Sequence, residues 1–317
     1  MKNNINEKLY KKINLYRIML LILSLVLIAL IVVFCLKTKK IDYITNNTSL
    51  VDPARRFSEA SNYVVNIQDL RQYLQKVGSQ YPDSISIYYE QVNSGANISV
   101  NKDARLFPAS LSKLVQGILI VSKVEKGELT FQTKLKTDPA DISSDSGNLY
   151  KTIGTQSLTV EELLSELIMN SDNTAQNIFK RSLNIKDYID FQYNTGLQDL
   201  YNENGFISAK EYTRILRVLY GATYLTIDNS EKILEYMSQS TFHDYLSQGI
   251  PRDIVFAHKY GENLHYNIFA DSGIVYIPGK PYFITVIIKG KDSSPETKKW
   301  AMDLMKEISL NAYSVGK

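Results

Sequence analysis

The chain has 317 residues, of which 44% are hydrophobic and 22% charged, a composition that suits one large globular domain or two small ones. Its formal charge of +3 combines two different parts, because residues 1–40 carry eight basic side chains and only one acid. The rest of the chain has 28 basic and 32 acidic groups, which argues against a nucleic-acid-binding surface.

A continuous apolar segment, IMLLILSLVLIALIVVFCL, runs from Ile18 to Leu36 without a charged residue. Its 19 residues would extend roughly 29 Å as a helix, enough to cross the hydrocarbon core of a bilayer. A cleaved signal peptide would have a shorter apolar core and small residues before the cut, and Phe34 before Cys35 also disfavours lipoprotein processing. We therefore predict one uncleaved transmembrane anchor over residues 18–36.

The charges around this segment indicate its orientation, since five basic groups precede it and three follow it. Cytoplasmic flanks are enriched in Lys and Arg, so we expect residues 1–17 to form a cytoplasmic tail and the bulk of the chain to lie outside the cell membrane after this single pass. Residues 37–62 are polar and aperiodic, which predicts a linker. The folded domain is then expected over residues 63–317.

Within this domain, helical periodicity over residues 65–77 precedes two alternating segments joined by the turn residues Asn93-Ser94-Gly95, which predicts a helix and a β-hairpin over 84–90 and 97–100. The patterns from Leu111 to about Thr241 are mostly helical, with helices expected over 111–126, 160–168, 173–182 and 209–220. Strand patterns return over 253–260, 273–277 and 282–288, before an amphipathic helix over 296–313. Strands at both ends predict one antiparallel sheet beside a helical lobe, with a functional cleft between them.

The first candidate for chemistry is the segment FPASLSK at residues 107–113. Pro108 suits a helix start, so Ser110 would lie in the first turn, with Lys113 on the same face one turn later. The positive end of a helix favours an alkoxide over an ammonium, so a desolvated Lys113 could take the serine proton. The same spacing occurs at Ser314 and Lys317, so the pair alone favours the structural interpretation, in which Ser110 caps the helix and Lys113 is a solvated charge.

The second candidate is Ser171-Asp172-Asn173, between two predicted helices. Residues of these types are also the preferred helix N-caps, which is the structural alternative. In the functional interpretation, Ser171 relays a proton, Asn173 holds the substrate through its amide, and Asp172 braces the loop.

The third candidate, HKYGE at residues 258–262, ends a predicted strand. Lys259 would offer positive charge to a substrate carboxylate, and Gly261 would let the backbone approach a ligand closely. The alternative is an exposed edge-strand lysine before a turn glycine.

In this order the three motifs resemble those of the class A β-lactamase-like serine hydrolases, a superfamily that includes penicillin-binding proteins. The resemblance runs from about residue 64 to residue 317 and includes SISIYYEQVNSGANISV, FPASLSKL, LTVEELLSELIMNSDNTAQNIF and HKYGE. It implies an α/β (α+β) fold with a five-stranded antiparallel sheet flanked by helices, plus a helical lobe. It also implies hydrolysis of β-lactams, with a D,D-peptidase acting on peptidoglycan stem peptides, or a binding or sensor module without turnover, as alternatives.

The resemblance also implies roles for particular residues. Ser110 would attack the carbonyl, Lys113 would accept its proton, and Ser171 would pass a proton to the leaving nitrogen. The remaining candidates would bind substrate, with the backbone amides of Ser110 and Glu262 forming an oxyanion hole; they are Asn173, Lys259, Tyr260, Gly261 and Glu262. We expect a monomeric catalytic domain with no metal or other cofactor, whose partners are the substrate and the lipid bilayer.

Two departures from the family pattern concern substrate recognition and deacylation. Tyr260 stands where the family usually carries Thr or Ser, whose hydroxyl helps to hold a substrate carboxylate. The segment between Gly196 and Ser208 is short and lacks the Glu-x-x-Leu-Asn in which the family carries a glutamate that activates water. Glu203 is the nearest acid there. His258 and the other two histidines are too scattered for a serine–histidine–aspartate triad, and His258 is expected to be a packed strand residue.

Overall fold

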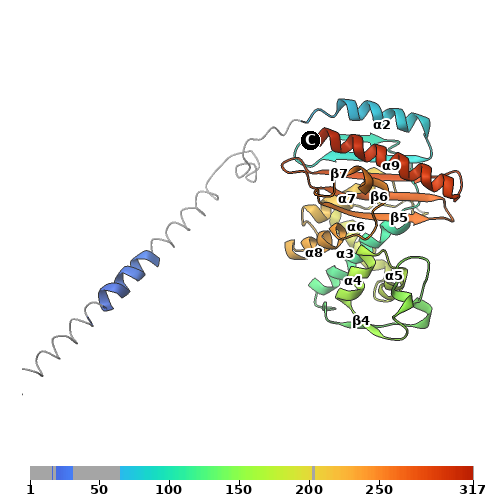
Figure 1. Ribbon diagram of the computed structural model, residues 1–317. Helices are drawn as coiled ribbons and strands as arrows, with labels where there is room; N and C mark the ends of the chain where they lie inside the picture. The colour runs from blue at the N-terminus through green and yellow to red at the C-terminus, as the bar shows by residue number, and fades with distance from the viewer. Residues whose placement is uncertain (1–15, 17–18, 31–64, 202–203, 317) are drawn as a thin grey trace, which may run out of the picture. The chain divides into compact units, whose positions relative to one another are not determined.

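The computed structural model of the chain describes Tyr16 and residues 19–30, 65–201 and 204–316 (Figure 1). The chain divides into two units, Met1–Ser61 and Asn62–Lys317. In the first unit, residues 19–30 are helical and their apolar side chains are exposed, Leu23 by 68%. No helix in the part of the chain that the structure describes is both long and apolar enough to cross a membrane. The rest of the predicted anchor and the linker at 37–62 lie outside the described residues.

The second unit is built on one five-stranded antiparallel sheet with the strand order β2-β1-β7-β6-β5 (Figure 1). Its strands are β1 (Ile85–Gln91), β2 (Asn97–Val100), β5 (Phe256–Asn263), β6 (Ile268–Val275) and β7 (Tyr282–Lys289). Pairing of β1 with β7, in which Tyr88 faces Thr285, joins the early hairpin to the late strands. The predicted antiparallel sheet, completed from both ends of the domain, is therefore confirmed, and β5 lies at its edge.

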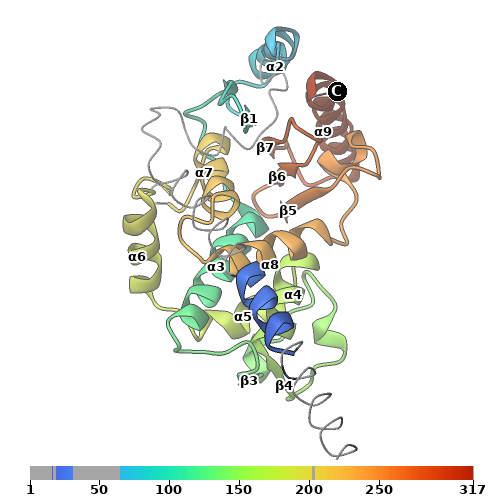
Figure 2. The same cartoon turned by 90° about the vertical axis from the view of Figure 1, so that its left-hand side faces the viewer.

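Helices bury both faces of this sheet. On one face α2 (Gln68–Gln80) and α9 (Pro295–Gly316) share an apolar core with Ile284, Val286 and Ile288 of β7. On the other face α7 (Ala209–Tyr220) packs with Phe283 and Ile287 of the same strand (Figure 2). Because alternate residues of a strand point to opposite faces, burial on both sides makes β7 apolar almost throughout.

The helical lobe lies beyond β5 and is centred on α3 (Ser112–Glu125), which is buried from Lys113 to Lys123 (Figures 1 and 2). Around α3 are α4 (Val160–Met169), α5 (Asn173–Lys180), α6 (Ile185–Thr195), α8 (Ile227–Ser238) and a two-stranded sheet of β3 (Lys134–Lys136) and β4 (Ser157–Thr159). Four 3-10 turns complete the described elements, at η2 (Ala109–Leu111), η3 (Pro139–Asp141), η4 (Leu149–Lys151) and η5 (Tyr245–Gly249).

Candidate active site

Ser110 lies in the 3-10 turn η2, which Pro108 precedes and which leads directly into α3. Ala109, just before the serine, has a φ of 49°, a left-handed conformation that costs a non-glycine residue about 1–3 kcal/mol. The turn is held in part by the Ser112 hydroxyl, which donates to the Ala109 carbonyl oxygen at 2.9 Å. The N-cap positions of η2 and α3 are held by Pro108 and Leu111 rather than by Ser110, so the alternative of a simple helix cap is wrong. Backbone strain of this kind is typical of functional sites.

Lys113 points into the protein interior and is only 1% exposed, so the alternative of a solvated helix charge is wrong. Its Nζ donates to the carbonyl oxygen of Ser171, to Asn173 Oδ1 at 2.5 Å and to Ser171 Oγ at 3.3 Å. The structure therefore brings three of the predicted residues together, although 60 positions separate Lys113 from Asn173. Among the described residues, no hydrogen bond joins Lys113 Nζ to Ser110 Oγ.

The environment of Lys113 makes it a plausible base. Burial lowers the pKa of Lys113 to about 7, with the Asp172 carboxylate opposing this shift and the Lys180 ammonium adding to it. An amine with this pKa is largely neutral just above pH 7, and a neutral amine has a lone pair that can accept a proton.

Lys259 brings a second amine into the same region from the edge strand β5. Its side chain has no exposed surface, so the alternative of an exposed edge-strand lysine is wrong. Burial and the nearby charge of Lys113 hold the pKa of Lys259 well below its usual range, against the opposing effect of Asp271. The two amines therefore lie within electrostatic reach of each other.

Asp172 holds the loop that carries Ser171 and Asn173. Its Oδ1 accepts hydrogen bonds from the backbone N–H groups of Thr174 and Ala175 at 2.8 and 3.0 Å, and its Oδ2 accepts one from Leu149 N–H at 2.9 Å. The carboxylate thus caps α5 and fastens a second loop. The structural alternative and the predicted bracing role are both correct for this residue.

The loop fastened in this way adds two residues that the sequence analysis missed. The Ser146 hydroxyl donates to the Ser171 carbonyl oxygen at 2.9 Å, and its own carbonyl oxygen accepts from Asn173 N–H at 3.0 Å. Gly147 has a φ of 85°, and a Cβ there would lie 1.9 Å from Asp172 Oδ2, so only glycine fits. Turn residues were the only sequence signal at these positions.

The backbone of β5 lies directly against the serine turn. A Cβ on Gly261 would be 3.1 Å from the backbone nitrogen atoms of Ser110 and Leu111, so this glycine permits a close approach between β5 and η2. The Glu262 carboxylate is occupied elsewhere, because it pairs with Lys298 at 2.9 Å and accepts from the Tyr245 hydroxyl at 3.0 Å. Only the backbone of Glu262 is therefore left for the predicted oxyanion role.

Tyr260 covers this part of the site. Its ring stacks on Phe242 with the centroids 3.8 Å apart, and its centroid lies 4.6 Å from Lys259 Nζ. Burial raises the pKa of Tyr260, and hydrogen bonding with the Ser146 and Ser171 hydroxyls opposes that shift. The phenol thus spans from Lys259 to the serine that is expected to relay a proton.

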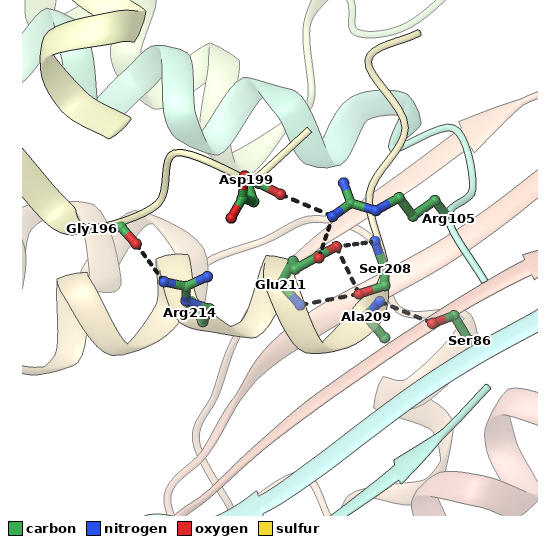
Figure 3. Close-up of polar contacts among 8 residues, drawn as sticks. All are labelled: Ser86, Arg105, Gly196, Asp199, Ser208, Ala209, Glu211 and Arg214. Carbon is green, nitrogen blue, oxygen red and sulfur yellow. Dashed lines mark hydrogen bonds and ion pairs between the residues drawn. The ribbon is translucent and has the colours of Figure 1, made fainter. Parts of the chain in front are cut away.

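The described residues Asp199 and Ser208, in and at the end of the segment that follows Gly196, take part in a separate polar network (Figure 3). Arg105 donates to Glu211 Oε1 at 2.5 Å and to the Asp199 carbonyl oxygen at 3.0 Å, while Glu211 Oε2 accepts from the Ser208 hydroxyl at 2.8 Å. Glu203 lies outside the described residues.

His258 is packed in the strand, as expected. It is 3% exposed, its ring stacks on Phe256, and its Nδ1 lies 2.8 Å from Asp271 Oδ1. Within the described ranges, no group of three or more His, Cys, Asp or Glu side chains is placed to hold a metal ion.

Comparison with known proteins identifies the family. Residues 69–315 match the family model of the Beta-lactamase enzyme family. The chain belongs to this family. Over 265 residues it is 24% identical to the β-lactamase VEB-1 of Pseudomonas aeruginosa, a match that covers 70% of this chain and 82% of that protein.

Solved structures share the β-lactamase-family fold. The structure of PBP-A superposes with a TM-score of 0.70 at 22% identity, covering 78% of this chain and 96% of that one. A β-lactamase from Xanthomonas campestris superposes with a TM-score of 0.70 at 21% identity, covering 80% of this chain and 100% of that one. These structures share the fold of this chain, which agrees with its membership of the Beta-lactamase enzyme family.

Proposed function

We propose that this protein is a membrane-anchored serine hydrolase that reacts with β-lactams through acylation of Ser110 outside the cell. The observation that carries the proposal is the set of three hydrogen bonds that hold the buried Lys113 amine against Ser171 and Asn173, one turn after Ser110. The exposed apolar helix at 19–30 supports the anchor, because such side chains are stable in lipid rather than in water.

The arrangement supports a balanced acylation step. Neutral Lys113 takes the proton of the Ser110 hydroxyl as Oγ bonds to the lactam carbonyl carbon. The carbonyl oxygen gains negative charge, which the backbone N–H groups of Ser110 and Glu262 would stabilise; one such donor is typically worth about 3–4 kcal/mol. The C–N bond then breaks, Lys113 returns its proton to Ser171 Oγ, 3.3 Å away, and the Ser171 hydroxyl protonates the leaving nitrogen.

Two similar proteins support this reaction. A mutant of PBP-A, similar to this chain in fold with a TM-score of 0.70, was solved as an acyl-enzyme complex with penicillin G. VEB-1, at 24% identity, is a β-lactamase. On the basis of these relatives, the proposal takes a β-lactam as the substrate of this chain.

A second candidate function is a penicillin-binding protein or D,D-peptidase with a long-lived acyl-enzyme, or a sensor that acylates once. The observation that favours it is the engagement of Glu211, whose two carboxylate oxygens are taken by Arg105 and Ser208. Asp199 contributes its backbone carbonyl to the same network. The Glu211 carboxylate is thus held in these contacts rather than free to activate a deacylating water.

Labelled penicillin, a chromogenic cephalosporin and intact-protein mass spectrometry separate the candidates. Turnover that is lost in Ser110→Ala supports a β-lactamase, whereas a stable one-to-one adduct on Ser110 supports a penicillin-binding protein or sensor. Trp300→Phe, which alters a cavity of about 640 Å³ between α2, the end of β7 and α9, is a matched control that should react normally. A folded wild-type protein that takes no label would overturn the proposal.

The membrane anchor has its own test. Protease added to intact cells should digest the domain at 63–317 and leave the residues before the anchor protected. A domain that becomes accessible only after the cells are lysed would place it on the cytoplasmic side and contradict the orientation.

A further inference from the structure

The amine of Lys259 is buried with few polar contacts. Its side chain has no exposed surface, and among the residues that the structure describes its Nζ donates one long hydrogen bond, 3.4 Å, to the Tyr260 carbonyl oxygen. An ammonium carries three N–H donors, so this single bond leaves it poorly compensated. The face of the Tyr260 ring, 4.6 Å from Nζ, provides the remaining contact through a cation–π interaction. The Tyr260 ring therefore lies against this buried amine.

The Tyr260 ring is held in this position from its other side. Phe242 stacks on it with an interplanar angle of 9°, and Phe242 in turn packs against Tyr245 with the centroids 4.9 Å apart. Tyr245 is fully buried in η5, and its hydroxyl donates to Glu262. A row of three aromatic rings thus connects Tyr260, which lies against Lys259, to the buried core beside α9.

Tyr260 lies on the side of the site where the leaving group would depart. The Ser146 and Ser171 side chains act to lower the pKa of Tyr260, which places its phenol near Ser171, the proposed proton donor to the leaving nitrogen. In a penicillin, the carbon bonded to the lactam nitrogen bears the carboxylate. The carboxylate of a bound penicillin would therefore fall beside Tyr260, and Lys259 is the amine next to it that does not already serve as the base.

We propose that Tyr260 determines substrate specificity by shielding Lys259, so that the site does not depend on a carboxylate next to the scissile nitrogen. The preferred acyl donors are then lactams or amides whose leaving nitrogen has an uncharged neighbour, such as an internal peptide bond or an esterified lactam. This inference rests on the proposed acylation of Ser110, and it names the substrate class for that reaction.

Penicillin G and its methyl ester test this proposal, because they differ only in the carboxylate. The measured quantity is the ratio of their second-order rate constants for acylating Ser110, acid over ester, followed by intact mass. In the wild type we expect the ester to react at least as fast as the acid. Tyr260→Thr uncovers Lys259 and should raise the ratio about tenfold or more, the usual effect of one charge-assisted hydrogen bond. Tyr260→Phe keeps the ring and should leave the ratio near that of the wild type.

A further variant keeps the test decisive if Tyr260→Thr does not fold. Phe242→Leu removes the stacking partner and leaves Tyr260 in place, so it should shift the ratio in the same direction by a smaller factor. A wild-type protein that already prefers the free acid by more than tenfold would overturn the proposal. So would an unchanged ratio in Tyr260→Thr, or an equal rise in Tyr260→Phe, which would make the hydroxyl rather than the ring responsible.

The result also shows which of the two proposals fails. If Ser110 is acylated in every variant but the ratio does not move, the shielding by Tyr260 is wrong and the acylation stands. If folded wild type and variants all remain unlabelled by both compounds, acylation of Ser110 by lactams is wrong and the shielding proposal falls with it.

Discussion

The candidate site around Lys113 and the polar network of Arg105, Glu211 and Ser208 contain positive charges in opposite surroundings. In the polar network, Arg105 faces a carboxylate, Glu211, whose second oxygen accepts a hydrogen bond from Ser208 (Figure 3). In the candidate site, Lys113 donates to uncharged oxygen atoms and lies near a second amine, that of Lys259. A paired guanidinium stays charged and serves structure, whereas a desolvated amine without a direct counter-ion loses its proton easily and becomes a base. Lys113 is therefore expected to be reactive because, among the described residues, no carboxylate pairs directly with its amine, whereas Arg105 has such a partner.

The largest effect that follows from this difference is expected for Lys113→Met, which fills the same space without the amine. The rate of acylation by labelled penicillin should fall by about 10²–10⁴-fold, the usual contribution of a general base. Lys123→Met on the same helix is a matched control, because Lys123 is paired with both Glu128 and Asp187. Equal losses of acylation in the two variants would show that the contrast between paired and unpaired cations has no catalytic meaning.

The pH dependence of acylation sharpens the same comparison. Since only the neutral amine accepts a proton and the pKa of Lys113 is about 7, the acylation rate should rise about tenfold per pH unit below 7 and level off above it. A stopped-flow rate profile measures this directly. A profile that is flat through neutral pH would remove Lys113 as the base.

The lowered pKa of Lys113 also predicts a trend in stability. The amine keeps its proton up to about pH 10.5 in the unfolded chain but releases it near pH 7 in the folded protein. Between these values the unfolded state binds more protons, so the free energy of unfolding should increase with pH. Urea denaturation of the wild type and of Lys113→Met should show this increase in the wild type alone, once the shared trend is subtracted.

Local sequence signals predicted much of the fold but not all of it. The strand at 97–100 and the helix at 209–220 have the predicted bounds, and Ser208 and Glu211 form a capping box that starts the helix. The helix α6 was not predicted separately, because its Ile185 and Tyr193 are exposed and give no inward-facing apolar period. Periodicity detects a helix only where its apolar residues face the core.

The strand β6 shows a second limit of sequence patterns. It begins at Ile268, five residues before the predicted strand start at Gly273, because Asp271 interrupts the apolar pattern. That aspartate is buried through hydrogen bonds with His258 and Leu246 N–H, both on other elements. A polar residue satisfied by tertiary contacts cannot be recognised as buried from its neighbours in sequence.

The same limit applies to the site. Motif spacing brought Lys113, Ser171 and Asn173 forward as a group, and the structure places them in hydrogen-bonding contact. The motif spacing gave no signal for the contact of Tyr260 with Phe242, because that contact depends on how a loop meets the edge strand. Contacts between distant segments without a motif become visible only in the folded chain.

A smaller effect is expected where a buried anion is fully compensated. Asp172→Ala removes three hydrogen bonds to backbone N–H groups and leaves those donors buried, so it should lower the free energy of unfolding by about 2–3 kcal/mol. Asn184→Ala, at the exposed cap of α6, should cost about 1 kcal/mol and serves as the control. Denaturant midpoints compare the two, and equal costs would mean that Asp172 does no more than cap a helix.

The smallest effect is expected in the polar network of Arg105 and Glu211, where Arg105→Met should lower the free energy of unfolding by about 1 kcal/mol. The side chains of Arg105 and Glu211 are 26% and 20% exposed, so water screens part of their attraction. A double-mutant cycle with Glu211→Gln isolates the pair from the packing of the arginine stem. Acylation of Ser110 should stay within about twofold of the wild type, since a structural ion pair acts on stability rather than on proton transfer. If acylation fell as far as in Lys113→Met, the polar network of Arg105 and Glu211 would belong to the reacting site. Charge pairing could then not explain why one region is reactive and the other is not.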